Sequence, residues 1–346
     1  MDISRLATRG EEHFTGGHEP IAMAEKVALA VDLGATRIRV CLGTNSGKII
    51  QKETRDMVIS AKMDDYVSQI TAAVSHLEKD VGSGDLEGIC VASPGPLDLK
   101  RGSIVHTANL PYAEVPVIDA LREEFGIEAY LVNDANAAAV GEWQLGAGKG
   151  LENVFYLTIS TGIGGGAVVD GRLLLGKEGN AAEVGHTTID SSGRLTCGCG
   201  RKGHWEAYCS GRSIPALTNL LWQGFDEATR EPLSVSTLVN GEPFSASVVF
   251  REATKGDRFA LKVLEELGRL NAIGLANVTD AYDPEIVTIG GGVALNNPDA
   301  VLSPIRTRMG EYAINRVPDV RITPLGDDAG LLGALSISFN PGLIGR

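Results

Sequence analysis

The stretch KVALAVDLGATRIRVCLGTN, from Lys26 to Asn45, decides the predicted fold. Its first part, VALAVDL, is a continuous apolar run of strand length, which indicates a buried strand. Gly34 ends the run in a turn, and the following RIRVCLG alternates between polar and apolar residues as a second strand would. The stretch therefore predicts two strands joined by a short turn.

Outward from this hairpin, segments typical of helices and strands alternate. A helix is expected in MDDYVSQITAAVSHLEKDVG, because Tyr66, Ile70, Ala73 and Leu77 recur at three- and four-residue spacings. LEGICVASPGPLD, VPVIDALREEFG and AYLVND then predict a strand, a helix and a further strand. This alternation is typical of an α/β domain with helices packed on a sheet.

The same plan recurs in the second half of the chain. NVFYLTISTGIGGGAVVDGRLLLG predicts two strands joined by a glycine-rich turn, and a long helix around residues 257–279 precedes the strand EIVTIGGGV. Residues 217–243 have weak periodicity and are expected to form a surface excursion. The pattern implies a second α/β half.

Length and composition limit the classes of protein to be considered. The chain has 346 residues, which is enough for two domains. Of these residues 43% are apolar and 22% charged, as in soluble globular proteins. The net charge of −13 argues against a protein that grips nucleic acid through its phosphates. No apolar run approaches the length of a membrane span, and residues 1–25 are too polar for a secretory signal.

Three glycine-rich turns each follow an apolar strand, at residues 32–36, 160–166 and 289–293. Small residues let backbone N–H groups close on phosphate oxygens, and a helix N-terminus adds a favourable dipole. One such turn is commonly structural, but three in equivalent positions indicate phosphate binding. None matches a Walker A motif or a dinucleotide fingerprint in a βαβ unit.

The segment VNDANAAA places Asp134 at the end of an apolar strand. A carboxylate there can accept the proton of a hydroxyl group in a closed cleft, which makes Asp134 a candidate general base. The alternative is structural, because an Asp in this position can also cap the alanine-rich helix that follows. The residues alone leave both possibilities open.

Cysteine and histidine residues form the densest cluster of the sequence. Cys197 and Cys199 have the spacing C-x-C, His204 follows five residues later, and His186 lies eleven residues before Cys197. Two thiolates and two imidazoles make a closed four-ligand set, which predicts a structural zinc site. Because the cysteines suit a metal better than a disulfide framework, the expected compartment is the reducing cytosol.

Two glutamates, Glu183 and Glu206, flank this cluster. A metal-bound loop could hold their backbones rigid and leave both carboxylates free to bind a polyhydroxyl ligand. The alternative is that both side chains simply face water, as most glutamates do.

Together, these motifs resemble those of the ROK family, named for repressors, open reading frames and kinases. Over residues 28–338, VDLGATRIRV is similar to the first phosphate motif of the family, TISTGIGGGAVVDGRLLLG to the second, and VTIGGGV to the adenosine-side motif. SPGPLD with the downstream NLP looks like a sugar-side segment, VNDANAAA like the segment of the catalytic aspartate, and AEVGH with CGCGRKGHWEAY like the zinc and sugar signature. The resemblance implies an α/β, actin-like (ribonuclease H-like) two-domain sugar kinase fold with a cleft between the domains.

The resemblance also implies domain limits. We expect residues 1–25 to form an N-terminal extension and residues 26–138 the N-terminal α/β domain. Residues 139–328 are expected to form the C-terminal α/β domain with the zinc-binding loop. The C-terminal helix, residues 329–346, is expected to rejoin the N-terminal domain.

Functional roles are carried over residue by residue. Asp134 is the expected catalytic base, and Asp32 is expected to orient Mg²⁺ through water. The expected sugar-binding residues are Gly95, Asn109, Asn133, Glu183, His186 and Glu206. The residues expected at ATP are Asp32, Gly34, Ala35, Thr36, Arg37, Thr161, Gly162, Gly291 and Gly292. The expected zinc ligands are His186, Cys197, Cys199 and His204.

One position departs from the family signature, which usually has a third cysteine where this chain has His204. Imidazole is an ordinary zinc ligand, so a site of two histidines and two cysteines is expected, with Cys209 as a possible substitute ligand. The metal is expected to pin the loop that carries Glu183 and Glu206, with little direct effect on the ATP-binding turns.

The activity implied by the resemblance is phosphoryl transfer from ATP·Mg²⁺ to a hexose hydroxyl, with glucose to glucose 6-phosphate as the first choice. N-acetylmannosamine, or another N-acetylhexosamine, is the alternative sugar, because Ala182 stands where glucokinases of the family often have glycine. A sugar-responsive repressor and a noncatalytic sugar-binding module are alternatives from other classes. The roughly 25 residues before the first strand are too few for the repressors' DNA-binding domain. A cytoplasmic homodimer or higher homo-oligomer is expected, with no nucleic acid or membrane partner.

Overall fold

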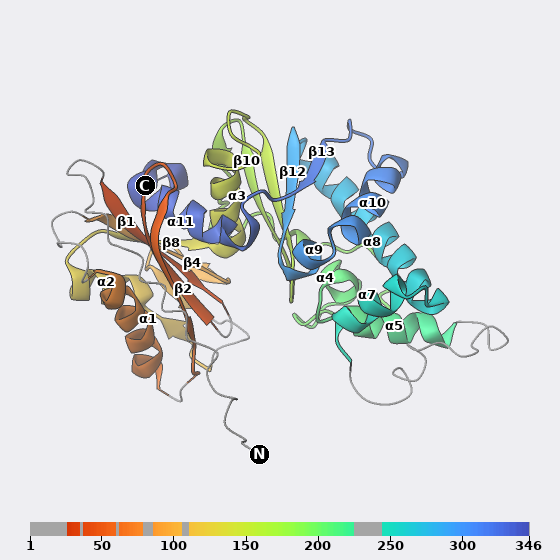
Figure 1. Ribbon diagram of the computed structural model, residues 1–346, viewed down its shortest axis with the longest axis horizontal. Helices are drawn as coiled ribbons and strands as arrows, with labels where there is room; N and C mark the ends of the chain where they lie inside the picture. Colours follow the sequence, from red (N-terminus) through yellow and green to blue (C-terminus); the bar gives the residue numbers. More distant parts are fainter. Residues whose placement is uncertain are drawn as a thin grey trace, which may run out of the picture.

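The computed structural model describes residues 26–34, 37–59, 62–78, 86–105, 111–224 and 244–345. The predicted extension, residues 1–25, lies outside the described residues. Two five-stranded sheets stand next to each other, with α3 (Asp134–Gln144) and α11 (Ala329–Phe339) between them (Figure 1). None of the described helices is both long and apolar enough to cross a membrane.

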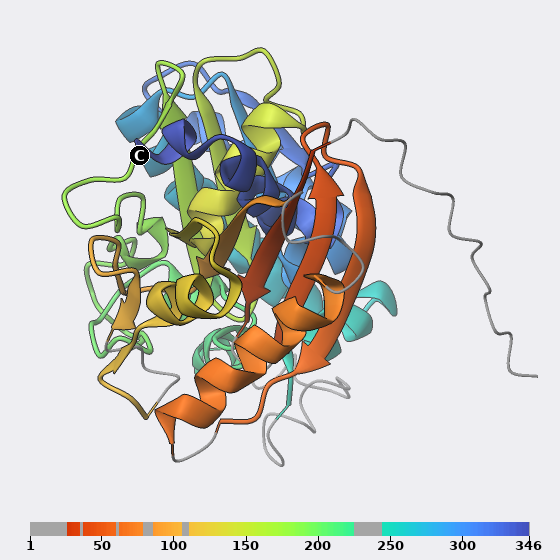
Figure 2. The ribbon, with the colours of Figure 1, turned by 90° about the vertical axis from the view of Figure 1, so that its left-hand side faces the viewer.

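The first sheet has the strand order β3-β2-β1-β4-β8. Its strands are β1 (Val27–Leu33), β2 (Arg37–Thr44), β3 (Ile49–Asp56), β4 (Leu86–Ser93) and β8 (Ala129–Asn133). The predicted hairpin is confirmed, since β1 pairs antiparallel with β2, and β1 also pairs parallel with β4. Helices α1 (Met63–Glu78) and α2 (Val117–Phe125) cover one face, and Figure 2 shows α1 lying across the strands. A separate small sheet contains β5 (Leu97–Asp98), β6 (Ser103–Val105) and β7 (Glu114–Val115).

The side chains of β1 explain why helices pack on both faces of this sheet. Every second residue from Val27 to Leu33 packs against α1 and α2, and Ile70 is one of the α1 residues on that side. The alternate residues Ala28 and Ala30 pack with α11 instead. Since successive side chains of a strand point to opposite faces, one apolar run supplies two cores.

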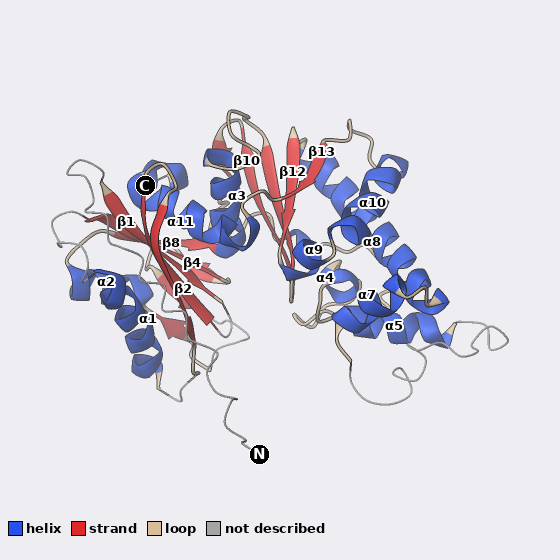
Figure 3. Cartoon of the chain, in the orientation of Figure 1, coloured by secondary structure: helices blue, strands red, loops and turns tan. Residues whose placement is uncertain are grey.

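The second sheet has the strand order β11-β10-β9-β12-β13. Its strands are β9 (Val154–Ile159), β10 (Ile163–Val169), β11 (Arg172–Leu173), β12 (Ile286–Gly290) and β13 (Asp319–Ile322). The longer helices of this half are α5 (Ile214–Gln223), α7 (Ala246–Thr254), α8 (Arg258–Tyr282) and α10 (Pro298–Arg308), gathered on the side away from the first sheet (Figure 3). Its short helices are η1 (Val184–His186), α4 (Glu206–Cys209), α9 (Gly292–Asn296) and η3 (Met309–Glu311); η4 (Gly326–Asp328) and η5 (Pro341–Ile344) flank α11.

Helices α3 and α11 pass each other at very close range. A Cβ atom on Gly333 would lie 1.7 Å from Ala137 O, and one on Gly141 would lie 2.4 Å from Ala329 O. α3 also packs on β9 and β10, whereas α11 packs on β1 and β4. The expected domain boundary at residue 138 therefore falls inside α3, the helix that contacts both halves.

Two local expectations differ from the structure. β8 ends at Asn133, so Asp134 is the first residue of α3 and not the last residue of a strand. The surface excursion expected from residue 217 is wrong in its first part, because α5 covers residues 214–223 and Trp222 packs edge-on against Phe259 of α8. Residues 225–243 lie outside the described residues.

Candidate active site

The parallel strands bring the predicted catalytic residues to one edge of the first sheet. In the register of β1, β4 and β8, Asp32 pairs with Ala92, and Ser93 pairs with Asn133. Asp134 follows directly, at the N-terminus of α3. The carboxyl ends of parallel strands are the edge at which ligands commonly bind in open α/β sheets.

Capping of α3 falls to Asn133 and leaves Asp134 available. Asn133 Oδ1 accepts hydrogen bonds from Ala135 N at 3.0 Å and Asn136 N at 3.2 Å. Asp134 Oδ1 accepts one from Ala135 N at 2.8 Å. Asn133 therefore fills the capping role considered for Asp134, and only its Nδ2 group is left for a sugar.

The surroundings of Asp134 raise its pKa to about 6. Burial has the largest effect, because it disfavours the charged carboxylate, and the negative charges of Asp32 and Glu183 act in the same direction. The hydrogen bond from Ala135 N opposes them. A carboxylate with this pKa is ionised at neutral pH and yet more basic than an ordinary Asp, which suits a general base.

Asp32 forms an ion pair with Arg39 across the first hairpin. The two residues stand opposite each other in the β1–β2 register, and Arg39 Nη1 also donates to Asp327 O at 2.6 Å. Asp32 therefore shares its carboxylate with a fixed cation, so its predicted Mg²⁺ role would use the remaining lone pairs. Arg39 was missed in the sequence, although pairing the hairpin around Gly34 would have aligned it with Asp32.

Sugar-side candidates from the two halves face each other. A Cβ atom on Gly95, in the turn after β4, would lie 3.8 Å from Asn133 Nδ2 and 3.9 Å from Glu183 Oε1. Asn180, which the sequence analysis missed, lies as close, with Oδ1 3.6 Å from that position. His186 Nε2 is 4.0 Å from Glu183 Oε2. The structure thus places amide, imidazole and carboxylate groups together, the types that bind sugar hydroxyls.

The second and third glycine-rich turns lie side by side at the carboxyl edge of the second sheet. β9 and β12 are parallel, with Thr158 opposite Gly290, so the turn with Thr161 and Gly162 adjoins Gly291. Gly291 has φ +86°, and a Cβ there would lie 2.6 Å from Ile159 O. This approach requires glycine at the position.

A pocket of about 350 Å³ opens beside the third turn. It is lined by Ser247, Phe250 and Arg251 of α7 and by Gly292, Val293 and Asn296 of α9. Its volume and mixed polar and apolar lining suit a nucleoside. The pocket lies on the predicted adenosine side and not at Asp134, so it can hold only one end of a nucleotide.

The predicted zinc ligands come together. One ligand atom from each of His186, Cys197, Cys199 and His204 lies within 4.8 Å of the others. His186 Nδ1 is 3.6 Å from Cys197 Sγ, and His204 Nδ1 is 3.4 Å from Cys199 Sγ. Two sulfur and two nitrogen donors in this arrangement fit a four-coordinate zinc ion, with no position open for water.

The protonation states of the cluster residues bear on how they would bind a cation. Burial lowers the pKa of His204, which favours the neutral imidazole that binds metals. Burial raises the pKa of Cys197 to about 12, so a bound metal would have to displace its proton. Cys209 lies outside the cluster, buried with Sγ 4.0 Å from Leu267 O, and is not placed to be a ligand.

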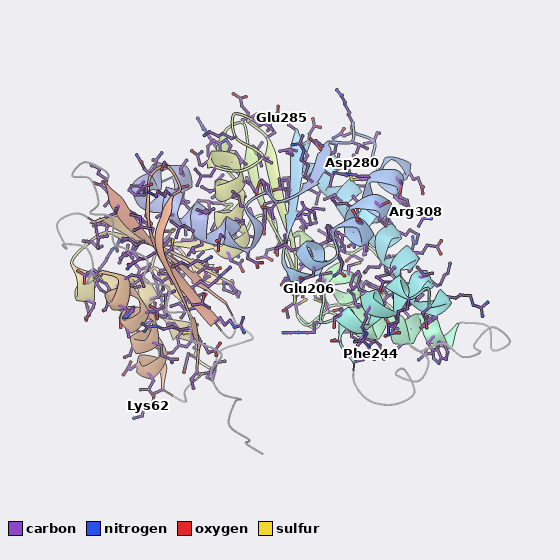
Figure 4. All side chains as sticks on the ribbon, in the orientation of Figure 1. Lys62, Glu206, Phe244, Asp280, Glu285 and Arg308 are labelled. Carbon is purple, nitrogen blue, oxygen red and sulfur yellow. The ribbon has the colours of Figure 1, made fainter. Side chains whose placement is uncertain are left out.

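Glu206, at the start of α4, lies near the lower ends of the second sheet's strands (Figure 4). Its Oε2 atom accepts a hydrogen bond from Ile163 N at 2.9 Å, directly after the second glycine-rich turn. Its Oε1 atom is 3.4 Å from Cys197 Sγ. The alternative that both glutamates merely face water is therefore wrong for Glu206, whereas the Glu183 side chain is 44% exposed.

The remaining predicted residues lie around the first turn or outside the described chain. Gly34 N donates to Arg37 O at 2.7 Å, and the Arg37 side chain is exposed and pairs with Asp56 at 3.3 Å. Three predicted residues lie outside the described ranges: Ala35, Thr36 and Asn109.

Comparison with known proteins extends over almost the whole chain. The sequence model of the ROK family matches residues 28–340. A glucokinase from Aeropyrum pernix is 38% identical over 328 residues, which cover 92% of this chain and 98% of the relative. An N-acetylmannosamine kinase from Yersinia pestis is 35% identical, with 88% of this chain and 96% of the relative covered.

A solved structure agrees with this result. The crystal structure of a ROK family glucokinase from Streptomyces griseus, in complex with glucose and AMPPNP, superposes with a TM-score of 0.72. It is 31% identical, and the match covers 90% of this chain and 98% of that one. The predicted family and the actin-like two-domain kinase fold are confirmed. The chain belongs to the ROK family.

Proposed function

We propose that this chain transfers the γ-phosphoryl group of ATP to a hexose hydroxyl, converting glucose to glucose 6-phosphate, with Asp134 as the general base. The observation that carries the proposal is the position of Asp134. Its half-buried carboxylate lies where the strands of the first sheet end, and its pKa is raised to about 6 in part by the negative charge of the nearby Glu183. The ROK-family kinases of similar sequence support the same class of activity.

The reaction needs a proton acceptor and an aligned phosphate. Asp134 Oδ2 takes the proton of the sugar hydroxyl as its oxygen attacks the γ-phosphorus, and the bond to the β,γ-bridging oxygen breaks to release ADP. Glu183, His186, Glu206 and the Asn133 amide hold the sugar. Positioning and charge stabilisation supply most of the rate in such transfers.

Metal ions have separate roles in this proposal. Mg²⁺ bound to the nucleotide neutralises phosphate charge, and Asp32 is the carboxylate that would orient it. Zinc, held by His186, Cys197, Cys199 and His204, would be structural, because four protein ligands leave no open position.

Sugar identity depends on the loop before Glu183. Ala182 has φ +62°, a left-handed conformation that glycine adopts without strain. Ala182 itself is buried in the apolar core of the second half, and it directly precedes the sugar-side residue Glu183 in the chain. N-acetylmannosamine is the second candidate substrate, since a relative of similar identity carries that name.

A substrate panel tests the proposal. Glucose, mannose, fructose, N-acetylglucosamine and N-acetylmannosamine are offered with ATP, and then with polyphosphate as donor. We expect the highest kcat/KM with glucose and ATP, at least about tenfold above the N-acetyl sugars. A preference for N-acetylmannosamine would reassign the substrate, and sugar binding without turnover would support a regulator or binding module.

Other expectations complete the proposal. The chain divides at α3 into N-terminal and C-terminal α/β domains, with α11 belonging to the first. A homodimer or higher homo-oligomer in the cytoplasm remains a prediction. Sedimentation analysis of the purified chain measures the oligomeric state.

A further inference from the structure

The predicted metal ligands belong to two segments that both pack on the second glycine-rich turn. The first segment is η1, which ends at the ligand His186. A Cβ atom on Gly185 would lie 2.1 Å from Ile163 O, so no side chain fits between η1 and the start of β10. Movement of His186 therefore moves the backbone that presses directly on Ile163.

The second segment begins at the ligand His204 and continues into α4. Glu206 Oε2 accepts the hydrogen bond from Ile163 N at 2.9 Å, and its Oε1 atom lies 3.4 Å from Cys197 Sγ. A Cβ atom on Gly162 would lie 2.6 Å from Glu206 Oε2, so the carboxylate occupies space that a larger residue would need. One side chain thus contacts both a predicted metal ligand and the turn.

The same segment holds the turn at two further points beyond α4. Gly211 N donates to Ser160 O at 2.7 Å, and Arg212 N donates to Thr161 O at 3.3 Å. Among the described residues, the N–H groups of Thr161 and Gly162 have no acceptor. The turn is therefore fixed through its carbonyl groups and through Ile163 N, with two N–H donors left for an anion.

We propose that Glu206 is a positioning residue for the phosphoryl donor, and that it couples occupancy of the metal cluster to nucleotide affinity. With a metal bound, the Cys197 and His204 segments would be fixed, the Glu206 carboxylate would keep its orientation, and its hydrogen bond from Ile163 N would hold the turn in the form that binds phosphate. The inference deepens the proposed function and rests on it, since ATP must be the ligand of this turn. It replaces the expectation that the metal has little effect on the ATP-binding turns.

Nucleotide binding without sugar tests this coupling independently of turnover. Calorimetry measures the Kd of AMPPNP with Mg²⁺ for the metal-loaded full chain and for Glu206→Ala and Glu206→Gln, each checked for metal content and circular dichroism. We expect about a tenfold weaker Kd in Glu206→Ala, because the N–H group of the buried residue Ile163 loses its charged acceptor. Glu206→Gln keeps an acceptor oxygen and should return to within about threefold of the wild type.

A matched control is Glu183→Ala, the other carboxylate beside the cluster. For Glu183 no hydrogen bond to the turn is found among the described residues, so this variant should keep the wild-type Kd for AMPPNP while sugar affinity falls. Removal of the cluster metal with a chelator should weaken AMPPNP binding by the wild type. It should have a much smaller further effect on Glu206→Ala, because the effects of two changes to the same coupled interaction are not additive.

Three results separate the inference from the proposed function. A metal-loaded Glu206→Ala chain with the Kd of the wild type overturns the coupling and leaves the kinase intact. Equal losses in Glu206→Ala and Glu183→Ala also overturn it, because the effect would then be general damage to the site. A wild-type chain that binds no AMPPNP removes the proposed ATP dependence and the coupling with it.

Discussion

The environment of Asp134 makes a quantitative prediction about how the rate depends on pH, namely where the rate falls at acid pH. A base acts only when it is deprotonated, so the rate should rise with pH through the pKa of about 6. From that value, roughly nine-tenths of the carboxylate is ionised at pH 7 and roughly one-tenth at pH 5. An Asp with an ordinary pKa near 3.9 would still be about nine-tenths ionised at pH 5.

The assay is kcat/KM for glucose at saturating ATP and Mg²⁺, from pH 8 to pH 5, with sugar phosphate quantified directly after quenching. Glucose has no ionisable group in this range, so the fall in rate at acid pH reports the enzyme–ATP·Mg²⁺ complex. Measuring ADP release together with AMPPNP binding at each pH separates the nucleotide's own titration from that of Asp134. A matched variant, Asp32→Asn, removes one nearby negative charge that raises the pKa of Asp134. The pKa of Asp134 should therefore fall, and the loss of rate at acid pH should shift to lower pH. A flat wild-type profile down to pH 5 would refute this account of Asp134.

Three further predictions concern stability and metal content. Asp134→Asn should raise the free energy of unfolding at pH 8 by about 1–3 kcal/mol, and this gain should be absent below about pH 4. The reason is that the raised pKa makes the ionised carboxylate destabilising, and this penalty grows as the pH rises from about 4, near the pKa of the unfolded chain, to about 6, the pKa in the folded chain. Denaturant titration at both pH values measures the difference. Elemental analysis should find one zinc per chain in the wild type and in Cys209→Ser, but a large loss in His204→Ala; equal zinc in both variants would exclude His204 as a ligand. Gly333→Ala should lower the free energy of unfolding by about 3 kcal/mol or more, because the added Cβ would lie 1.7 Å from Ala137 O. The control Gly310→Ala, whose nearest contact would be at 3.8 Å, should lower it by less than about 1 kcal/mol. Similar melting temperatures of the two variants would contradict the α3–α11 packing.

Features set by local sequence could be predicted well. The run VALAVDL contains large and small apolar residues in alternation, so it encodes a central strand with a core on each face. The cluster of two cysteines and two histidines was also predictable, because three of its four possible metal ligands lie within eight residues and the fourth is in the same loop region. In both cases the pattern that indicates the feature lies within a short stretch of sequence.

The missed features depend on tertiary structure or on buried polar groups. Glu206 and Ile163 are 43 residues apart in the sequence. No local sequence pattern indicates that a carboxylate will accept a hydrogen bond from a backbone N–H so far away along the chain. α5 was missed because Thr218 is fully buried, with its hydroxyl bonded to Ile214 O, and this polar residue interrupts the apolar period.

The most direct test of the central claim is the turnover of Asp134→Asn with glucose and ATP, followed by detection of glucose 6-phosphate by phosphorus NMR. The substitution removes the base and keeps the shape of the side chain, so the account predicts at least about a hundredfold lower kcat in a folded chain that still binds AMPPNP. Near-wild-type turnover in that variant would contradict the assignment of Asp134 as the base.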